Sequence, residues 1–372
     1  MRLDRQRYNL ICGTRETYSL SSLQYCLDAI KGCKDIMLIT LPLVLFIVMT
    51  EVSIGSFTVL VLLDWRNEVK RGFLVSYALI YLGLTYLTYL FQQNFSTPEL
   101  LSNYHQLDQY WARYETLPLL IFLLLMIPYN VLLLFDKTSG VDAKRDAEKA
   151  QLEQTNGGEA TAEKLKVPVR HFSIIRLLRL FSGIGTVAAG LTTLFVMAMI
   201  YRPLASANFG GALTVAGFFA AALALGGVLT AMWLGHWYLV TPALSEKPLQ
   251  FATTLVLLGV LAQVLFAFTA GPSTVQTNVQ QLPATPVITT PTTTPNNHVK
   301  PANAPTYTPL STDAISWIRI LVSFIIPLVL GGLAWKLIRD RSFQSATGML
   351  YLVVVCTLAG EAMARGLFLV GL

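Results

Sequence analysis

The sequence contains few charged residues for its length. Asp, Glu, Lys and Arg make up only 13% of the 372 residues, whereas soluble domains carry about 25%. Hydrophobic residues make up 54%, and the mean hydropathy is +0.56. This composition excludes a water-soluble globule and a disordered chain, and it indicates a multi-pass membrane protein that contacts a lipid bilayer. The net charge of +6 lies in loops between apolar runs, so we expect no nucleic-acid partner.

Residues that hold metals and haem are also scarce. The four cysteines form no Cys-x-x-Cys pair, which excludes the usual iron–sulfur and zinc patterns on this chain. The four histidines do not supply the facing pairs within membrane spans that a b-type haem needs. We therefore expect no haem, iron–sulfur cluster or metal site. The residues concerned are Cys12, Cys26, Cys33 and Cys356, and His105, His171, His236 and His298.

Catalytic motifs are absent as well. The chain contains no Walker A loop, no Gly-x-Ser-x-Gly elbow and no His-Glu-x-x-His sequence, which argues against an ATPase or hydrolase. We predict no catalytic residues. The chain is at most a non-catalytic subunit of an enzyme.

Long apolar runs dominate what is present. A helix needs about 20 apolar residues to cross the hydrocarbon layer, and eight runs meet this length. Their Leu, Gly and Ala content lacks the alternation of a β-barrel. The sequence predicts an all-α, polytopic membrane bundle of about eight transmembrane helices. The runs are 37–63, 72–91, 117–135, 174–201, 209–235, 250–270, 315–337 and 347–371.

Basic residues alternate between the connecting loops. The loops after the first, third and seventh runs are rich in Lys and Arg, and the loops between them are poor in both. Cytoplasmic loops carry this excess, so we expect an inner-membrane protein with both termini outside. Residues 1–35 contain six basic residues and argue for the opposite side, but only Lys31 and Lys34 lie near the first span.

The segments outside the spans differ in character. We expect residues 1–36 to form a surface segment with an amphipathic helix over 19–31, because Leu and Ile recur there at helical spacing. The charged loop at 137–170 is expected in the cytoplasm between the helices of 37–271. Residues 272–312 are rich in Pro and Thr, which predicts a disordered outside loop ahead of the last two helices in 313–372. Aromatic residues at 104–114 predict an interfacial helix.

Ionisable residues inside spans are costly and therefore candidates for function. Glu51 lies near the centre of the first span. It could serve a proton relay or a quinone site, or it could be a neutral carboxyl that hydrogen-bonds a neighbouring helix.

Glu361 and Arg365 stand four residues apart in the last span, on one face of a helix and with the acid first. They could form a structural ion pair, or they could line an outward-facing pocket for the polar head of a redox carrier. Arg319 could join this pocket, although beside Trp317 it could equally anchor its helix at the interface.

Other polar residues and one small-residue ridge complete the candidates. His236 is expected in an aromatic rim at the cytoplasmic end of the fifth span, with proton uptake as an alternative role. Arg176 and Arg179 are expected to bind lipid headgroups. The fifth span repeats alanine every four residues from Ala212 to Ala224, which predicts a central, closely packed helix.

Residues 359–368 read Ala-Gly-Glu-Ala-Met-Ala-Arg-Gly-Leu-Phe. This segment resembles the Gly-Glu-x-x-x-Arg-x-x-Phe ending of membrane anchor subunits of the dimethyl sulfoxide reductase and polysulfide reductase type, which also have eight spans. The Pro/Thr-rich loop and the charged cytoplasmic loop depart from that family's pattern.

The resemblance implies that the chain binds quinone or quinol in its bundle, with Glu361 and Arg365 at or near the site. It also implies electron exchange with a partner iron–sulfur subunit that serves a molybdopterin enzyme. Two other functional classes are also compatible with the sequence. The chain could be a structural or assembly protein without redox function, or a proton-coupled secondary transporter using Glu51 and the last-span pair.

The topology can be tested by cysteine labelling in intact cells, in a background where the four native cysteines are serine. We expect Thr293→Cys to react with a membrane-impermeant reagent and Lys149→Cys to react only after the membrane is permeabilised, because loop charge places these positions on opposite sides. Labelling of Lys149→Cys alone would reverse the predicted orientation.

Overall fold

The computed structural model describes most of the chain as helix. It describes residues 20–102, 104, 106–136, 174–205, 208–240, 245–270 and 317–369, of which 20–40 are described by their backbone alone. The described residues contain no strand. Eight helices are long and apolar enough to cross a membrane, which confirms the predicted all-α polytopic bundle. The predicted loops at 137–170 and 272–312 lie outside the described residues.

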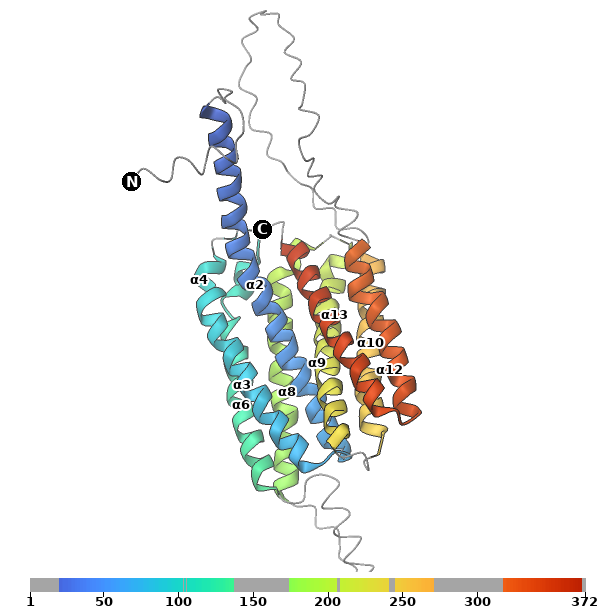
Figure 1. Ribbon diagram of the computed structural model, residues 1–372. Helices are drawn as coiled ribbons and strands as arrows, with labels where there is room; N and C mark the ends of the chain where they lie inside the picture. The colour runs from blue at the N-terminus through green and yellow to red at the C-terminus, as the bar shows by residue number, and fades with distance from the viewer. Residues whose placement is uncertain are drawn as a thin grey trace, which may run out of the picture. The chain divides into compact units, whose positions relative to one another are not determined.

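The spanning helices lie side by side along a common direction (Figure 1). A π-helical turn, η3 (Leu321–Ile325), leads directly into the seventh of them. The helices are α2 (Leu20–Arg66), α3 (Arg71–Phe95), α6 (Thr116–Phe135), α8 (Ile174–Tyr201), α9 (Ala212–Val240), α10 (Lys247–Ala270), α12 (Ile326–Arg339) and α13 (Phe343–Leu369).

The first helix differs from its prediction. The expected helix at 19–31 and the first span form one helix, α2, which runs for 47 residues and includes Pro42. Between Ile30 and Met37 the only weak helix former is Gly32, which costs about 1 kcal/mol in a helix and does not end one. Residues 1–43 and 44–372 form two separate compact units. The second unit, residues 44–372, contains all the spans except the first three residues of the first one.

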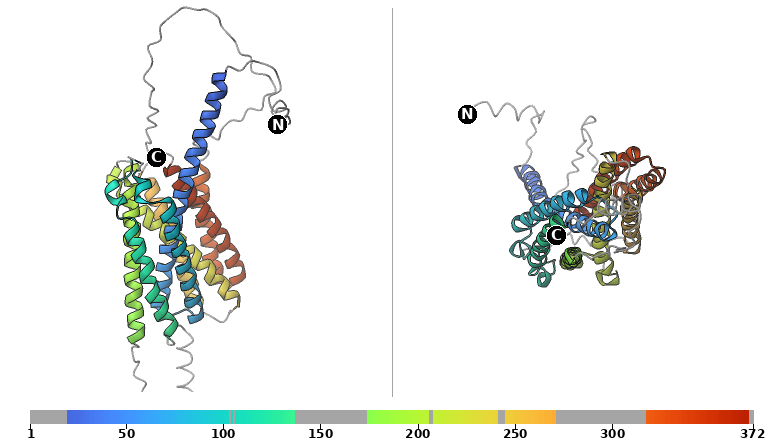
Figure 2. Two further views of the ribbon diagram at one scale, coloured as in Figure 1. Left: turned by 90° about the vertical axis from the view of Figure 1, so that its left-hand side faces the viewer. Right: turned by 90° about the horizontal axis from the view of Figure 1, so that it is seen from below.

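Helix α9 lies at the centre of this unit. It packs against α8, α10 and α13, and it also crosses α2, where a Cβ on Gly55 would lie 1.8 Å from the carbonyl oxygen of Ala222. Helices α3, α6 and α8 lie on one side of α2 and α9, and helices α10, α12 and α13 lie on the other (Figure 2). The central position predicted for the fifth span is therefore confirmed.

The crossing of α2 and α9 depends on two glycines. A Cβ on Gly226 would come within 2.0 Å of the carbonyl carbon of Gly55, closer than any real side chain allows. The absence of side chains lets the two backbones touch, as small residues do in membrane helix pairs. On another face of α9, Gly259 of α10 packs against Ala224.

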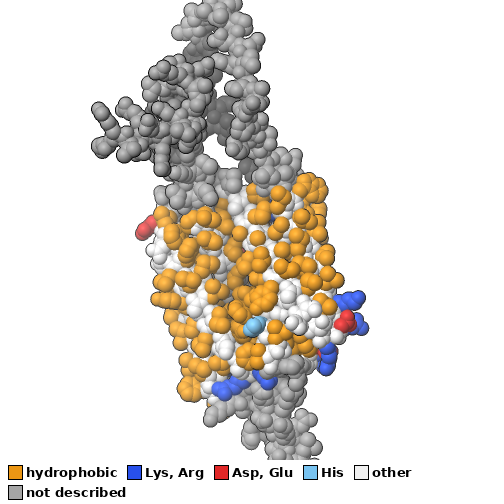
Figure 3. All heavy atoms as spheres, in the orientation of Figure 1, with side chains coloured by type: hydrophobic (Ala, Val, Ile, Leu, Met, Phe, Trp, Pro, Cys, Tyr) orange, Lys and Arg blue, Asp and Glu red, His pale blue; other side chains and the backbone are white. Residues whose placement is uncertain are grey.

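Large apolar side chains cover the outside of the bundle, and Lys and Arg gather near one end (Figure 3). This end, called the basic end, includes Arg66, Lys70, Arg71, Arg339 and Arg341. The apolar belt is suited to contact lipid tails, as expected of a protein in a lipid bilayer. Of the eight spans, that of α2 is the most buried and that of α12 the least.

The segment between α3 and α6 forms two short helices at the end opposite the basic end, namely α4 (Pro98–Leu101) and α5 (Gln109–Ala112). The side chain of Asp108 caps α5 by accepting from the Tyr110 amide at 3.0 Å. Tyr110 and Tyr114 are 63% and 47% exposed. The predicted interfacial helix is thus present, in shorter pieces than expected.

The glycine crossing generates a stability prediction. We expect Gly55→Ala to destabilise the purified protein by at least about 1–3 kcal/mol, because the new methyl group has no room beside α9. Thermal unfolding in detergent measures the effect. Gly83→Ala is the matched control, since a Cβ at Gly83 meets nothing within 4 Å, and it should stay within about 1 kcal/mol of the wild type. Equal stability of the two variants would contradict the described crossing.

Candidate functional site

The predicted pair on the last span is present in α13. Arg365 Nε lies 2.8 Å from a carboxylate oxygen of Glu361, one helical turn earlier. Both residues are 8% exposed. A buried ion pair of this kind requires good geometry to offset the desolvation of both groups. The sequence spacing alone predicted this contact correctly.

A second acid reaches the same guanidinium from the other end of the chain. Glu51 of α2, fully buried, accepts a hydrogen bond from Arg365 although the two residues are 314 positions apart. Glu51, Glu361 and Arg365, named here the charged cluster, therefore hold two carboxyl groups on one guanidinium. The sequence provided each residue as a candidate but did not indicate that Glu51 meets the pair.

An aromatic ring supports the guanidinium. The Arg365 Cζ atom lies 3.7 Å from the ring centroid of Phe218 on α9, which gives a cation–π contact in a desolvated setting. Phe218 also stacks with Tyr201 of α8 at a centroid distance of 6.3 Å. The charged cluster thus contacts α2, α9 and α13 at once.

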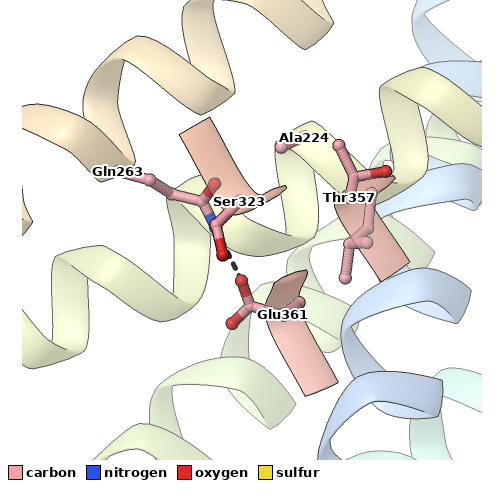
Figure 4. A pocket seen from close by; sticks show the side chains of 6 residues that line it. Ala224, Gln263, Ser323, Thr357 and Glu361 are labelled. Atoms are coloured by element: carbon pink, nitrogen blue, oxygen red, sulfur yellow. Dashed lines mark hydrogen bonds between the residues drawn. The ribbon is translucent and has the colours of Figure 1, made fainter. Parts of the chain in front are cut away.

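A small pocket adjoins the charged cluster on the side of Glu361 (Figure 4). Gln263 of α10 donates to Glu361 at 2.9 Å across this pocket. The free space has room for about one water molecule, so an aromatic ring would fit only after side chains move. The lining residues are Ala224, Leu225, Gln263, Ser323, Thr357 and Glu361.

The wall of the pocket contains an irregular helical turn. Ser323 lies in η3, and its buried hydroxyl has no protein partner. A Cβ on Gly360 of α13 would lie 2.6 Å from that hydroxyl oxygen, so only glycine lets the π-helical turn approach α13 this closely. π-Helical turns occur frequently at functional sites. The turn brings a free hydrogen-bonding group to the carboxylate of Glu361.

Arg319 lies one turn before Ser323 and belongs to the same region. Its guanidinium interacts electrostatically with both Glu361 and Arg365, and its buried Nε has no hydrogen-bond partner. Trp317 is 70% exposed, as expected of an interfacial side chain. Arg319 thus supplies a second positive charge near the carboxyl group of Glu361.

The remaining predicted site residue lies elsewhere. His236 is exposed near the end of α9 at the basic end, whereas Ala224 of the same helix lines the pocket. Ala224 and His236 are twelve positions apart, which corresponds to about 18 Å along the helix axis. His236 is therefore not part of the charged cluster. His105, His171 and His298 lie outside the described residues.

Three polar pocket residues were not identified from the sequence. Gln263 was detectable in principle, because an amide in the middle of an apolar run is costly unless it finds a partner. Ser323 and Thr357 carry hydroxyls that are common in membrane helices and often bond their own backbone. Thr357 does bond Val353, at 2.8 Å, so its type alone gave no signal.

A second buried ionic cluster lies near the basic end. Arg179 of α8 is fully buried and donates to Asp64 at 2.9 Å and to Asp136 at 2.7 Å. Tyr129 adds a hydrogen bond to Asp64 at 3.1 Å. The expectation that Arg179 binds lipid headgroups is wrong, because two acids at the ends of α2 and α6 turn it inward. The cluster ties the ends of three helices together.

No protein-family model, curated protein or solved structure matches the chain at a significant level. The chemistry of the pocket and the charged cluster is therefore the basis for the functional proposal below. Gln263 and Arg365 contact the carboxylate of Glu361, and the hydroxyl of Ser323 lines the same pocket. Such a site can hold a polar carbonyl group and exchange a proton with it.

The charged cluster generates an ordered prediction for stability. Arg365→Gln leaves two buried carboxyl groups without their shared partner and should cost about 3–5 kcal/mol. Glu361→Gln should cost less, because Arg365 still pairs with Glu51. The triple variant Glu51→Gln/Glu361→Gln/Arg365→Gln should be more stable than Arg365→Gln. Thermal unfolding ranks the variants, and Glu361→Gln ranking below Arg365→Gln would contradict the shared guanidinium.

Proposed function

We propose that the chain is the membrane subunit of a multi-subunit oxidoreductase, and that it binds quinone or quinol in the pocket beside Glu361. Under this proposal the chain exchanges electrons with a partner iron–sulfur subunit that serves a molybdopterin enzyme. The observation that carries the proposal is the convergence of a buried carboxylate, a free hydroxyl and an amide donor on one pocket. The partner subunits rest on the resemblance of residues 359–368 alone.

The donor set suits a quinone headgroup. Ser323 offers a hydroxyl without a protein partner, and Gln263 offers an amide that now bonds Glu361. Both can turn to a carbonyl oxygen. Oxidation of bound quinol to quinone would pass two electrons to the proposed iron–sulfur partner and release two protons. Glu361, the ionisable residue among those that line the pocket, would accept the protons one after the other and release each to water. Arg365 holds the carboxylate of Glu361 in place and also pairs with Glu51.

The position of the pocket suits a ligand that arrives from lipid. One wall is formed by Ser323 of η3, and the span that contains η3, Trp317–Arg339, is the least buried of the eight. Leu321 and Ile325 of the π-helical turn face outward at 47% and 48% exposure. Since the pocket now has room for about one water molecule, entry of a ring requires this wall to move. A π-helical turn is a local irregularity that allows such a movement.

Ser323→Ala tests the proposal with little risk to folding. We expect it to weaken binding of a fluorescent quinone analogue and to lower quinol-dependent electron transfer by about tenfold, the loss of one hydrogen bond to the ligand. Thr192→Ala is the control, because Thr192 is exposed on α8 and bonds its own backbone at 2.9 Å. The triple variant of the charged cluster should lose both activities.

A structural role is the alternative class, and the small size of the pocket favours it. In that case the charged cluster only holds α2 to α13. The triple variant, if folded, would then keep full quinol turnover in the assembled complex. That result would reject the quinone site, whereas loss of turnover with intact partner attachment would support it.

A further inference from the structure

A second buried carboxyl group lies at the end of the bundle opposite the basic end. Glu115 precedes α6 and is 2% exposed. Among the described residues its hydrogen-bond donor is the hydroxyl of Ser96, which lies 3.2 and 3.1 Å from the two carboxylate oxygens. No salt bridge to Glu115 is found among the described residues. Unlike Glu51 and Glu361, this acid has no compensating guanidinium.

Two further buried polar side chains lie on the helices that meet at this carboxyl group. Gln92 lies one turn before Ser96 on α3, is 1% exposed, and finds no partner for its amide oxygen or nitrogen. The hydroxyl of Tyr201 from α8 is fully buried, makes no hydrogen bond of normal geometry, and lies close enough to Ser96 and Glu115 to interact with both. Unsatisfied buried polar groups are rare in folded proteins and mark places where water or an ion binds.

The helix ends add to the negative potential. Helices α3 and α8 both end here, at Phe95 and Tyr201, and a helix C-terminus carries a partial negative charge. The start of α6 offsets part of it.

We propose that Gln92, Ser96, Glu115 and Tyr201, named here the Glu115 site, bind one small monovalent cation such as Na⁺. A hard cation prefers oxygen ligands, and these four side chains offer a carboxylate, an amide oxygen and two hydroxyls. A single positive charge matches the single uncompensated carboxylate. The cation would join the ends of α3, α6 and α8, which meet at this point.

Thermal unfolding of the purified full-length protein tests the site. The unfolding temperature should rise with NaCl at constant ionic strength set by choline chloride, because a ligand that binds only the folded state stabilises it. Glu115→Gln keeps an acceptor for Ser96 and should remove the sodium dependence. Glu99→Gln, at an exposed acid of the same end, is the control and should retain it.

A second variant separates cation binding from folding. Gln92→Leu replaces an unsatisfied amide with an apolar side chain, so it should fold while its apparent sodium affinity falls about tenfold. Equilibrium binding of radioactive sodium to each variant gives a direct measure. A sodium response that survives in Glu115→Gln would place the ion elsewhere and overturn the proposal. A wild type stabilised by acid but not by sodium would show that Glu115 takes only a proton, and would also overturn it.

Discussion

Charge compensation inside a medium that does not solvate charge is the constraint on which the bundle depends. Arg365 can remain in the bundle because two acids share it, and the acids can remain because Arg365 and Arg319 lie close by. Glu361 and Arg365 belong to α13, Glu51 belongs to α2, and Arg319 precedes η3. The charged cluster therefore fixes which helices are neighbours as well as which groups are neutralised, and the pocket beside Glu361 exists because of that arrangement.

Close backbone packing makes the charge compensation possible. Gly55 lies one turn after Glu51 on α2, and its contact with α9 brings α2 close to the helix that carries Phe218. A larger residue at Gly55 would push α2 away from α9 and lengthen the contact between Glu51 and Arg365. Packing and electrostatics are thus coupled through neighbouring positions on one helix.

The sequence predicted the features that depend on local spacing. Eight apolar runs of about 20 residues gave the spans, and the four-residue spacing of Glu361 and Arg365 gave their ion pair. Contacts between distant segments were not predictable in this way. Nothing near Glu51 indicates Arg365 as its partner, and nothing near Arg179 indicates two acids on other helices. Gln263 was the missed residue with a usable signal.

The Arg179 cluster and the Glu115 site differ in how their buried carboxyl groups are neutralised. Near the basic end, Arg179 forms salt bridges with two acids where α2, α6 and α8 come together. At the opposite end, Glu115 accepts from a neutral hydroxyl and forms no salt bridge with the described residues. Identical burial therefore leads to different chemistry, because the neighbours decide whether a carboxyl group is held by a guanidinium or left to bind something else. The residue type alone does not distinguish these cases.

The contact between Glu51 and Arg365 can form only late in biosynthesis, after the last helix has been made. A ribosome delivers Glu51 to the membrane more than three hundred residues before it delivers Arg365, as their separation of 314 positions requires. During that interval Glu51 has no partner and the first helix cannot take its final place. The bundle closes around the charged cluster only when the last helix arrives, so a chain that stops before α13 retains an unpaired acid that marks it as unfinished.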